Sequence, residues 1–430
     1  MTSITSVFSK IQKKRLLLAG DFMLDSYTFG KTKRISPEAP VPVLHVESFE
    51  SRPGGAGNVA LNLVSLGQQV ALLGRIGQDD AACDLVRCLQ KEGIDTSGLF
   101  VQEGFKTPKK ERLIAQNQQL LRIDYENECS LTSEIEQQVI AHIKNVIHTF
   151  DLVAISDYAK GFLSHTVLRA LIDLARKQGI PVIVDPKGAD FSKYAHATLL
   201  KPNLSEAKAC ANLPGATLHE IANEILKKTD VETLMITRSE AGISLFSQDG
   251  TSSDFPVPSA KEIRDVTGAG DTVLAVVAAL LANNLSLHDA TPLANIAAQI
   301  AVERVGCAQV TLQEIAERLI DLRAERKVFH ANQEAILEHA LLGKEFVQLK
   351  VKGPFDVDYN LLKLLRDIAS QHSQKLLVTI DAHDHAEEQA QMLALIQTVD
   401  YVQIQENNKN TESRDIKPQA FFEYSGKSYS

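Results

Sequence analysis

The stretch Asp265-Val-Thr-Gly-Ala-Gly-Asp-Thr272 leads into an apolar run from Val273 to Leu281. This pattern predicts a glycine-rich turn followed by a buried helix. Glycines just before a helix leave backbone N–H groups exposed at the positive end of the helix dipole, and such a turn binds anionic oxygens. Asp271 falls in the first helical turn, where its carboxylate can take a proton from a substrate. On this stretch alone, a tight turn with Asp271 as an ordinary N-terminal helix residue is the alternative.

Short apolar strands and amphipathic helices alternate along the chain on the N-terminal side of this turn. The apolar runs are β-rich and bounded by Gly, Pro or Asp, at Leu16–Ala19, Val70–Leu73, Leu152–Ile155, Val182–Val184 and Leu234–Ile236. Helical spacing of apolar residues occurs between them, as in Thr166–Gln178 and Ile221–Lys228. Buried strands separated by helices predict an α/β fold with a mostly parallel sheet covered on both faces.

Two segments interrupt this alternation. Val41 to Phe49 alternates apolar and polar residues and is preceded by Pro40, which favours an edge strand. Glu111 to Tyr125 also predicts a half-buried strand. We expect these segments, at about 31–52 and 110–126, to form a small β flap, or lid, over a pocket. An ordinary antiparallel extension of the sheet edge is the alternative.

Charge density rises at Arg323–Lys327, and the glycine motifs stop there. We therefore expect two domains, residues 1–325 and 326–430. Strands predicted at Phe346–Val351, Leu376–Ile380 and Tyr401–Ile404, with helices between them, indicate a second, smaller α/β unit. The polar segment Asn407–Lys417 is predicted to be mobile.

Composition excludes several classes of function. The 430 residues carry a net charge of −9 with acidic residues spread along the chain, which disfavours nucleic acid and anionic membranes as partners. No apolar stretch is long enough to span a bilayer, and Leu16–Ala19 is too short for the apolar core of a signal peptide. The five cysteines lack metal-ligand spacing, which predicts reduced thiols in a cytoplasmic protein.

Over about residues 12–320 the chain resembles the ribokinase-type (PfkB) carbohydrate kinases. The motifs in the order and spacing of that family are Gly20-Asp-Phe-Met-Leu-Asp25, Pro53-Gly-Gly-Ala-Gly-Asn58, Lys201-Pro-Asn-Leu-Ser-Glu206, Thr237-Arg-Ser-Glu-Ala-Gly242 and Asp265–Thr272. Further motifs are similar to the kinase half of the bifunctional heptose 7-phosphate kinase/heptose 1-phosphate adenylyltransferases: Ser36-Pro-Glu-Ala-Pro-Val-Pro42, Asn117-Gln-Gln-Leu-Leu-Arg-Ile-Asp124, Ser156-Asp-Tyr-Ala-Lys-Gly161 and Val184-Asp-Pro-Lys-Gly188.

The resemblance implies ATP-dependent phosphorylation of D-glycero-D-manno-heptose 7-phosphate at its anomeric hydroxyl, a step toward ADP-heptose for the lipopolysaccharide core. It implies Mg²⁺ as cofactor, leaves room for a monovalent cation, and suggests a homodimer paired through the flap strands. Two alternatives stay open. One is another kinase of the family, acting on a fructose phosphate or ribose. The other is a non-catalytic regulator that binds sugar or nucleotide.

The resemblance also assigns roles to individual residues. Asp271 would be the general base, with Gly268, Ala269 and Gly270 as the anion hole. Asp25, expected at the carboxyl edge of the first strand, would accept sugar hydroxyls. The other residues expected to bind the sugar phosphate are Gly54, Gly55, Asn58, Lys110, Arg112, Asp157, Lys160 and Lys187, with Arg34 and Arg122 as further cations near the same motifs. Residues expected along the nucleotide are Lys201, Asn203, Glu206, Thr237, Arg238, Gly242, Thr267 and Asn295, with Glu206 holding Mg²⁺ through water.

The smaller unit resembles the nucleotidyltransferase half of the same bifunctional enzymes, beginning at Val351-Lys-Gly-Pro-Phe-Asp356. Those domains carry an HxGH motif just after the Phe-Asp, whose histidines bind the triphosphate. Here the place is taken by Asp358-Tyr359-Asn360. Neutral or acidic side chains cannot replace those charges at a phosphate site. We therefore expect this domain to lack adenylyltransferase activity.

Overall fold

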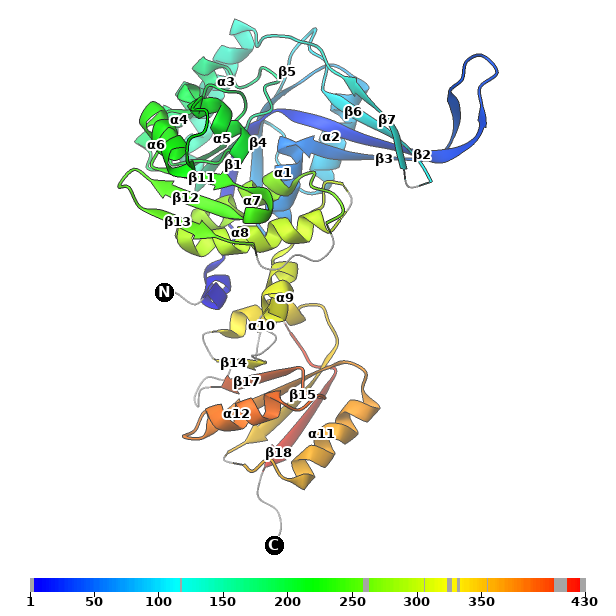
Figure 1. The fold of residues 1–430 in the computed structure, drawn as a ribbon, viewed down its shortest axis with the longest axis vertical. Coiled ribbons are helices and arrows are strands. Elements are labelled where there is room, and N and C mark those ends of the chain that lie inside the picture. Colours follow the sequence, from blue (N-terminus) through cyan, green and yellow to red (C-terminus); the bar gives the residue numbers. More distant parts are fainter. Residues whose placement is uncertain are drawn as a thin grey trace. The chain divides into compact units, whose positions relative to one another are not determined.

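The computed structural model describes residues 4–116, 118–257, 263–304, 306–322, 327–330, 333–353, 355–405 and 416–425. The chain divides into two compact units (Figure 1), of which the larger is Gln12–Val310 and the smaller combines Met1–Ile11 with Thr311–Ser430. This division lies earlier than the expected boundary at 325/326. The difference is helix α9 (Leu312–Leu322), which packs against α10 (Glu334–Leu341) of the smaller unit, whereas the rise in charge comes only after α9.

The larger unit is built on a nine-stranded sheet among its described residues, in the order β13-β12-β11-β10-β9-β8-β1-β4-β5. The seven strands from β11 to β5 run parallel, and β12 and β13 join antiparallel at one edge. The strand bounds are β1 Arg15–Gly20, β4 Gln69–Ile76, β5 Leu99–Val101, β8 Leu152–Ser156, β9 Val182–Asp185, β10 Leu199–Leu200, β11 Thr233–Thr237, β12 Ile243–Ser247 and β13 Ser252–Phe255. The predicted mostly parallel α/β fold is confirmed.

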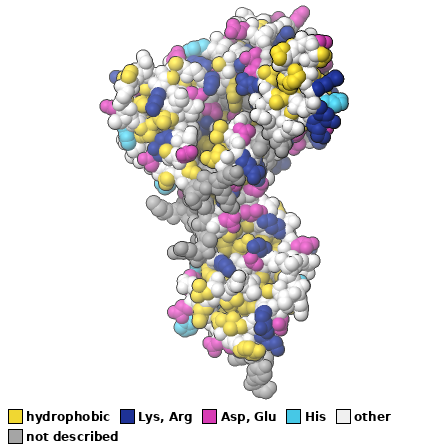
Figure 2. All heavy atoms as spheres, turned by 45° about the vertical axis from the view of Figure 1, so that its right-hand side comes forward, with side chains coloured by type: hydrophobic (Ala, Val, Ile, Leu, Met, Phe, Trp, Pro, Cys, Tyr) yellow, Lys and Arg dark blue, Asp and Glu magenta, His cyan; other side chains and the backbone are white. Residues whose placement is uncertain are grey.

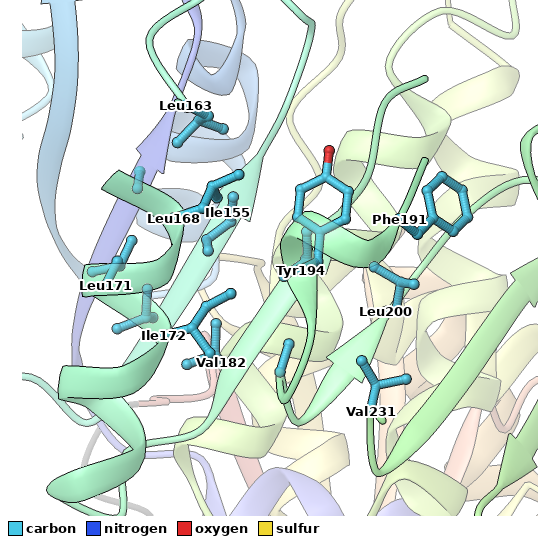
Figure 3. Close-up of a cluster of buried hydrophobic side chains, with 14 of the residues drawn as sticks. Ile155, Leu163, Leu168, Leu171, Ile172, Val182, Phe191, Tyr194, Leu200 and Val231 are labelled. Atoms are coloured by element: carbon cyan, nitrogen blue, oxygen red, sulfur yellow. The ribbon is translucent and has the colours of Figure 1, made fainter. Parts of the chain in front are cut away.

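Helices cover both faces of this sheet because its strands are apolar on both sides. Alternate residues of the strands, such as Leu17, Val153 and Val182, pack in one cluster with α3, α4, α5 and α6. Part of this cluster is drawn in Figure 3, where Ile155 and Val182 of the sheet lie beside Leu168, Leu171 and Ile172 of α4. On the opposite face α1 and α7 contact the sheet, and α8 packs on α7. The helix bounds are α1 Ala56–Ser65, α2 Asp80–Lys91, α3 Ser133–Val146, α4 His165–Lys177, α5 Leu204–Ala211, α6 Leu218–Thr229, α7 Ala269–Ala282 and α8 Leu287–Val302.

The segments expected to form a flap lie in a separate four-stranded sheet, here called the lid sheet, in the order β3-β2-β6-β7. Its strands are β2 Phe22–Ile35, β3 Pro42–Gly55, β6 Lys109–Ala115 and β7 Gln118–Tyr125. The prediction of one strand over Glu111–Tyr125 is wrong, because β6 and β7 are antiparallel strands that pair Leu113 with Leu121. The chain reverses near Gln116, whose φ is 51°. The polar residues 116–119, Gln-Asn-Gln-Gln, interrupt the apolar positions there, but they include no glycine or proline that would mark a turn.

Asp25 also lies elsewhere than expected. Strand β1 ends at Gly20, and the buried Asp21 separates it from β2, which carries Asp25 as its fourth residue. Asp25 therefore belongs to the lid sheet, at the end nearest the main sheet.

The smaller unit is a second α/β structure, with a parallel sheet in the order β14-β17-β16-β15-β18 among its described residues. Strands β17, β16, β15 and β18 reproduce the 3-2-1-4 order of doubly wound folds. Its elements are η1 Ile4–Lys10, β14 Val328–Phe329, β15 Phe346–Lys352, α11 Tyr359–Gln371, β16 Lys375–Asp381, α12 Ala386–Ala394, β17 Tyr401–Gln405 and β18 Ala420–Ser425, besides α9 and α10. The sequence pattern missed β18. Apart from its last two residues, the predicted mobile segment Asn407–Lys417 lies outside the described residues. Within the described part of the chain, no helix has the length and apolar character needed to cross a membrane.

Candidate active site

The turn before α7 is held by its own sequence. Gly268 is the N-cap, with a φ of 80° that suits glycine, and Asp265 accepts hydrogen bonds from Thr267 N and Gly306 N at 2.9 Å each. The first i→i−4 bond of the helix runs from Thr272 N to Gly268 O at 2.9 Å. The N–H groups of Gly270 and Asp271 come before this first helical bond. Because they have no partner within the helix, they are available to an anion.

The carboxylate of Asp271 is buried and is held by residues from two distant segments. Asn58 on α1 donates its Nδ2 to Oδ2 at 2.8 Å, and the Tyr158 hydroxyl donates to Oδ1 at 2.7 Å. Asp271 is 5% exposed and lines a pocket that also contains Gly268 and Gly270. The predicted base therefore faces the predicted anion hole.

Burial raises the pKa of Asp271 above its ordinary value. The hydrogen bonds from Asn58 and Tyr158 and the charge of Lys201 oppose this rise, while the charge of Asp25 adds to it. A carboxylate with a raised pKa is a stronger base when ionised, which suits it to proton transfer near neutral pH.

Lys201 brings a buried positive charge into the same pocket. Its Nζ lies 2.9 Å from Asp185 at the carboxyl end of β9, and a Cβ placed on Gly270 would lie 3.7 Å from that Nζ. Burial raises the pKa of Asp185 to about 6 despite the neighbouring Lys201. The pocket is lined by Asp157, Tyr158, Asp185, Pro186, Lys187, Lys201, Asn203, Glu206, Thr237, Gly268, Gly270 and Asp271.

Asp25 forms a buried ion pair with a cation of the lid. Its Oδ1 is 2.6 Å from Nη1 of Arg112 on β6. Gly54 makes room for it, since a Cβ there would lie 2.1 Å from Asp25 Oδ2, and Gly55 adopts a φ of 56°. Cys307 links this group to the anion hole: its Sγ is 3.9 Å from Asp25 Oδ2 and would be 3.6 Å from a Cβ on Gly268.

The loop after β8 carries Asp157 and Lys160, both expected at the sugar. Asp157 Oδ2 accepts from the Tyr194 hydroxyl at 2.6 Å and pairs with Lys193 at 2.7 Å, and its Oδ1 accepts from Ala159 N. These bonds make Asp157 a brace for the loop. Lys160 forms an ion pair at 2.6 Å with Glu126, the residue that follows β7.

The remaining lid cations differ in their surroundings. Lys110 Nζ lies 6.0 Å from the centre of the Tyr158 ring, beside the site. Arg122 pairs with Asp124 on its own strand, and Arg34 is an exposed residue near the end of β2. Neither arginine lines the pocket.

The residues expected at the nucleotide begin at the N-terminus of α5. Asn203 and Glu206 form a capping box, and Glu206 Oε1 also pairs with Lys187 Nζ at 2.8 Å. Glu206 and Asp185 are two of the four carboxylates that line the pocket with the glycine turn, and oxygen donors of this kind fit a divalent cation that keeps part of its water shell.

The other residues expected along the nucleotide fall into two groups. Thr237 lines the pocket, and Gly242 has a φ of 83° and would place a Cβ 2.1 Å from Phe255 O. Arg238 and Asn295 instead make structural bonds, to Asp254 Oδ1 at 3.0 Å and to Phe255 O at 2.8 Å. Thr267 is exposed at the start of the glycine turn.

Sequence reasoning assigned no role to four residues of this region. Tyr158 and Asp185 stand inside motifs that were singled out, but the motifs show only that the positions are near the site. Asp21 accepts the backbone N–H groups of Tyr158 and Lys160 at 3.0 Å each. Cys307 follows a glycine in a stretch without any pattern, and no signal in the sequence points to it.

Residues 14–314 match the pfkB family carbohydrate kinase. The chain belongs to this family. It is 45% identical over 315 residues to the "Bifunctional protein HldE" of Trichlorobacter lovleyi, an alignment that covers 73% of this chain and 64% of that relative. Against the protein of the same name from Aliarcobacter butzleri it is 35% identical over 442 residues, covering 97% of this chain and 92% of the relative.

Solved structures agree with the fold of the larger unit. The Arabidopsis thaliana ribokinase, solved with ribose and ATP, matches with a TM-score of 0.57 at 18% identity, covering 72% of this chain and 99% of that one. Phosphofructokinase-2 from Escherichia coli, in complex with substrates and products, matches with a TM-score of 0.59 at 21% identity and the same coverage. At these identities the likeness establishes the ribokinase-like fold.

Proposed function

We propose that the chain transfers the γ-phosphoryl group of ATP to the anomeric hydroxyl of D-glycero-D-manno-heptose 7-phosphate and forms the 1,7-bisphosphate. The observation that carries this proposal is the placement of the buried Asp271 carboxylate beside the N–H groups at the start of α7. The heptose-kinase motifs and the similarity to HldE proteins support the choice of sugar. The alternatives, a kinase for another sugar and a regulator, have no comparable support.

On the sugar side, the carboxylate of Asp25 is suited to accept hydroxyls of the heptose. Asp271 then takes the proton of the anomeric hydroxyl as the oxygen attacks phosphorus. The lid cations Lys110 and Arg112 lie next to this region and suit the 7-phosphate, because guanidinium binds phosphate in a bidentate manner.

On the nucleotide side, the N–H groups of Gly270 and Asp271 and the ammonium of Lys201 face the charge that develops on the transferred group. Glu206 would hold Mg²⁺ through water, and the ion would neutralise phosphate oxygens when it is bound. Thr237 lines the same pocket and is suited to contact the nucleotide.

A coupled assay of ADP release tests the substrate assignment, with heptose 7-phosphate, fructose 6-phosphate and ribose as acceptors. We expect the highest kcat/KM with heptose 7-phosphate. A higher kcat/KM for either of the other sugars would change the assigned substrate and leave the assignment as a kinase in place. If no acceptor releases ADP above the rate without sugar, the regulator becomes the better proposal.

The smaller unit, we propose, lacks adenylyltransferase activity. At the place of the expected histidine motif, the Asp358 side chain accepts a hydrogen bond from Leu361 N at 2.9 Å and caps α11. A carboxylate there repels a triphosphate. Mass-spectrometric detection of ADP-heptose from heptose 1-phosphate and ATP is the test, and sustained turnover would contradict the proposal.

The lid sheet supports a homodimer. Large hydrophobic side chains are exposed on its strands and hairpin, namely Ile35, Val41, Val46, Phe49, Leu120 and Leu121. Figure 2 shows hydrophobic side chains at the surface of the larger unit beside lysines and arginines. The edge strands β3 and β7 are open to pairing. Light scattering should give twice the monomer mass, and Phe49→Lys should shift the protein toward the monomer.

We place the enzyme in the cytoplasm. Its five cysteines are all free, which fits a reducing compartment.

A further inference from the structure

Tyr158 holds one of the two oxygens of the proposed base. Its hydroxyl donates to Asp271 Oδ1 at 2.7 Å, while Asn58 Nδ2 donates to Oδ2 at 2.8 Å. Two donors on opposite oxygens fix the plane of the carboxylate. Each carboxylate oxygen has two lone pairs, so acceptor capacity remains for the hydroxyl of a sugar.

Hydrogen bonds to buried charged side chains fix the backbone around Tyr158. Asp21 Oδ2 accepts from Tyr158 N and Lys160 N, and Arg75 Nη2 donates to Lys160 O at 2.7 Å. Ala159 has a φ of 55°, a conformation that costs energy for a residue with a side chain. A strained residue braced by buried charges indicates that the direction of its neighbour's side chain matters.

The environment keeps the Tyr158 hydroxyl a donor. Burial and the charge of Asp271 raise the pKa of Tyr158 well above its ordinary value, so the phenol stays protonated throughout the working range of pH. The other groups that act on Asp271 come from four further segments: Lys201 after β10, Asp185 on β9, Asp25 on β2 and Cys307. Of these, Lys201 alone favours the ionised base, and the carboxylates Asp185 and Asp25 oppose it. Burial raises the pKa of Cys307 to about 12, so its thiol stays neutral.

We propose that Tyr158 is a positioning residue of the kinase: its hydroxyl aims Oδ1 of Asp271 and keeps the buried carboxylate ionised against the surrounding acidic groups. This inference rests on the proposed function, in which Asp271 is the base. In this role Tyr158, which also lines the pocket, acts through Asp271 and not directly on the sugar or ATP.

The pH profile of kcat/KM is the test, because it reports the base in the free enzyme. Tyr158→Phe removes a hydrogen bond to a charged group, so the acidic limb should move to higher pH by about one to two pH units. Site-specific 3-fluorotyrosine at position 158 makes the phenol a stronger donor and should move the limb to lower pH. Tyr194→Phe is the matched control, since Tyr194 is a buried tyrosine whose hydroxyl donates to Asp157. Its limb should stay in place.

The outcomes separate this inference from the kinase assignment. Opposite shifts for phenylalanine and fluorotyrosine, with no shift in Tyr194→Phe, support the role of Tyr158. An unmoved limb in either active Tyr158 variant overturns it, and if Tyr158→Phe fails to fold, the fluorotyrosine protein decides alone. If Asp271→Asn instead turns over at the full rate, Asp271 is not the base, and the proposed mechanism fails whatever Tyr158 does.

Discussion

Two aspartates at the starts of two helices show how position changes the chemistry of one residue type. Asp358 accepts from Leu361 N of its own helix α11, and this bond lowers its pKa. Asp271 stands in the first turn of α7, but its oxygens accept from Asn58 and Tyr158, and burial raises its pKa. A carboxylate that bonds its own backbone stabilises a helix. One that is held by distant side chains and kept dry can serve as a base.

The largest effect that tests this contrast is expected for Asp271→Asn. Asparagine keeps the size of the side chain but cannot take a proton, so kcat should fall by about 10²- to 10⁴-fold while ATP still binds. Steady-state ADP release and a nucleotide-binding titration measure the two quantities. Asp358→Asn is the matched control and should leave the kinase rate unchanged. Equal losses in both variants would remove the distinction between the two aspartates.

Lys201 and Asp185 provide the next largest effect, because they form the charged pair beside the base. Lys201→Met should lower kcat by roughly 10²-fold, as for the loss of a group that stabilises transition-state charge. It should also destabilise the larger unit by roughly 3 kcal/mol, the low end for breaking a buried pair, since the Asp185 side chain is 21% exposed.

Adding Asp185→Asn to Lys201→Met should restore stability but not the rate, since the buried charge without a partner is then gone. Urea unfolding and ADP release follow the two separately. The pair of Asp185 and Lys201 also predicts a component of the pH profile that is separate from the titration of Asp271. Below about pH 6 Asp185 becomes protonated, Lys201 loses its partner, and activity should fall. In Asp185→Asn that part of the pH profile should disappear. A profile that keeps this part would show that another group titrates there.

How far the sequence predicts this site depends on the distance between partners. The glycine turn and Asp271 lie within eight consecutive residues, and the alternation of strands and helices was enough to predict the mostly parallel sheet. Asn58 was predicted to contact sugar, yet it bonds Asp271, which lies 213 positions away. Tyr158 is 113 positions from Asp271. Contacts of this kind are set by tertiary packing, which local periodicity does not encode.

The lid shows the same limit at short range. Alternating residues predicted a strand over Glu111–Tyr125, but the hairpin turn has no Asn-Gly or Gly-Gly signal that would mark it. Asp25 was expected at the end of the first strand because a single apolar run covers both strands, with only Asp21 between them. In each case the sequence predicted the type of structure, but not the residue at which one strand ends and the next begins.

Gly54→Ala tests whether the placement of Asp25 matters as that of Asp271 does. A methyl group there would lie 2.1 Å from Asp25 Oδ2 and must push the carboxylate away. We expect the KM for the sugar phosphate to rise roughly 10- to 100-fold, with little change in the KM for ATP, because a displacement of this size misplaces the sugar. Gly67→Ala is the control for general destabilisation: its methyl group meets open space, but a φ of 80° strains an alanine there, so the variant should lose stability and keep both KM values. A larger change in the KM for ATP would place Gly54 on the nucleotide side.

The smallest effect should come from Asp358→Ala, which removes the cap of α11 and nothing at the kinase site. The folded-state pKa of Asp358 is lowered, so the stability it contributes is present above its unfolded pKa and is lost as the pH falls through the folded value. At neutral pH the smaller unit should therefore melt at a slightly lower temperature than in the parent protein, and in strong acid the two should melt alike. Calorimetry at the two pH values measures this difference. A drop in kinase rate in the same variant would mean that the helix start in the smaller unit takes part in the reaction, which the local bonding of its aspartate argues against.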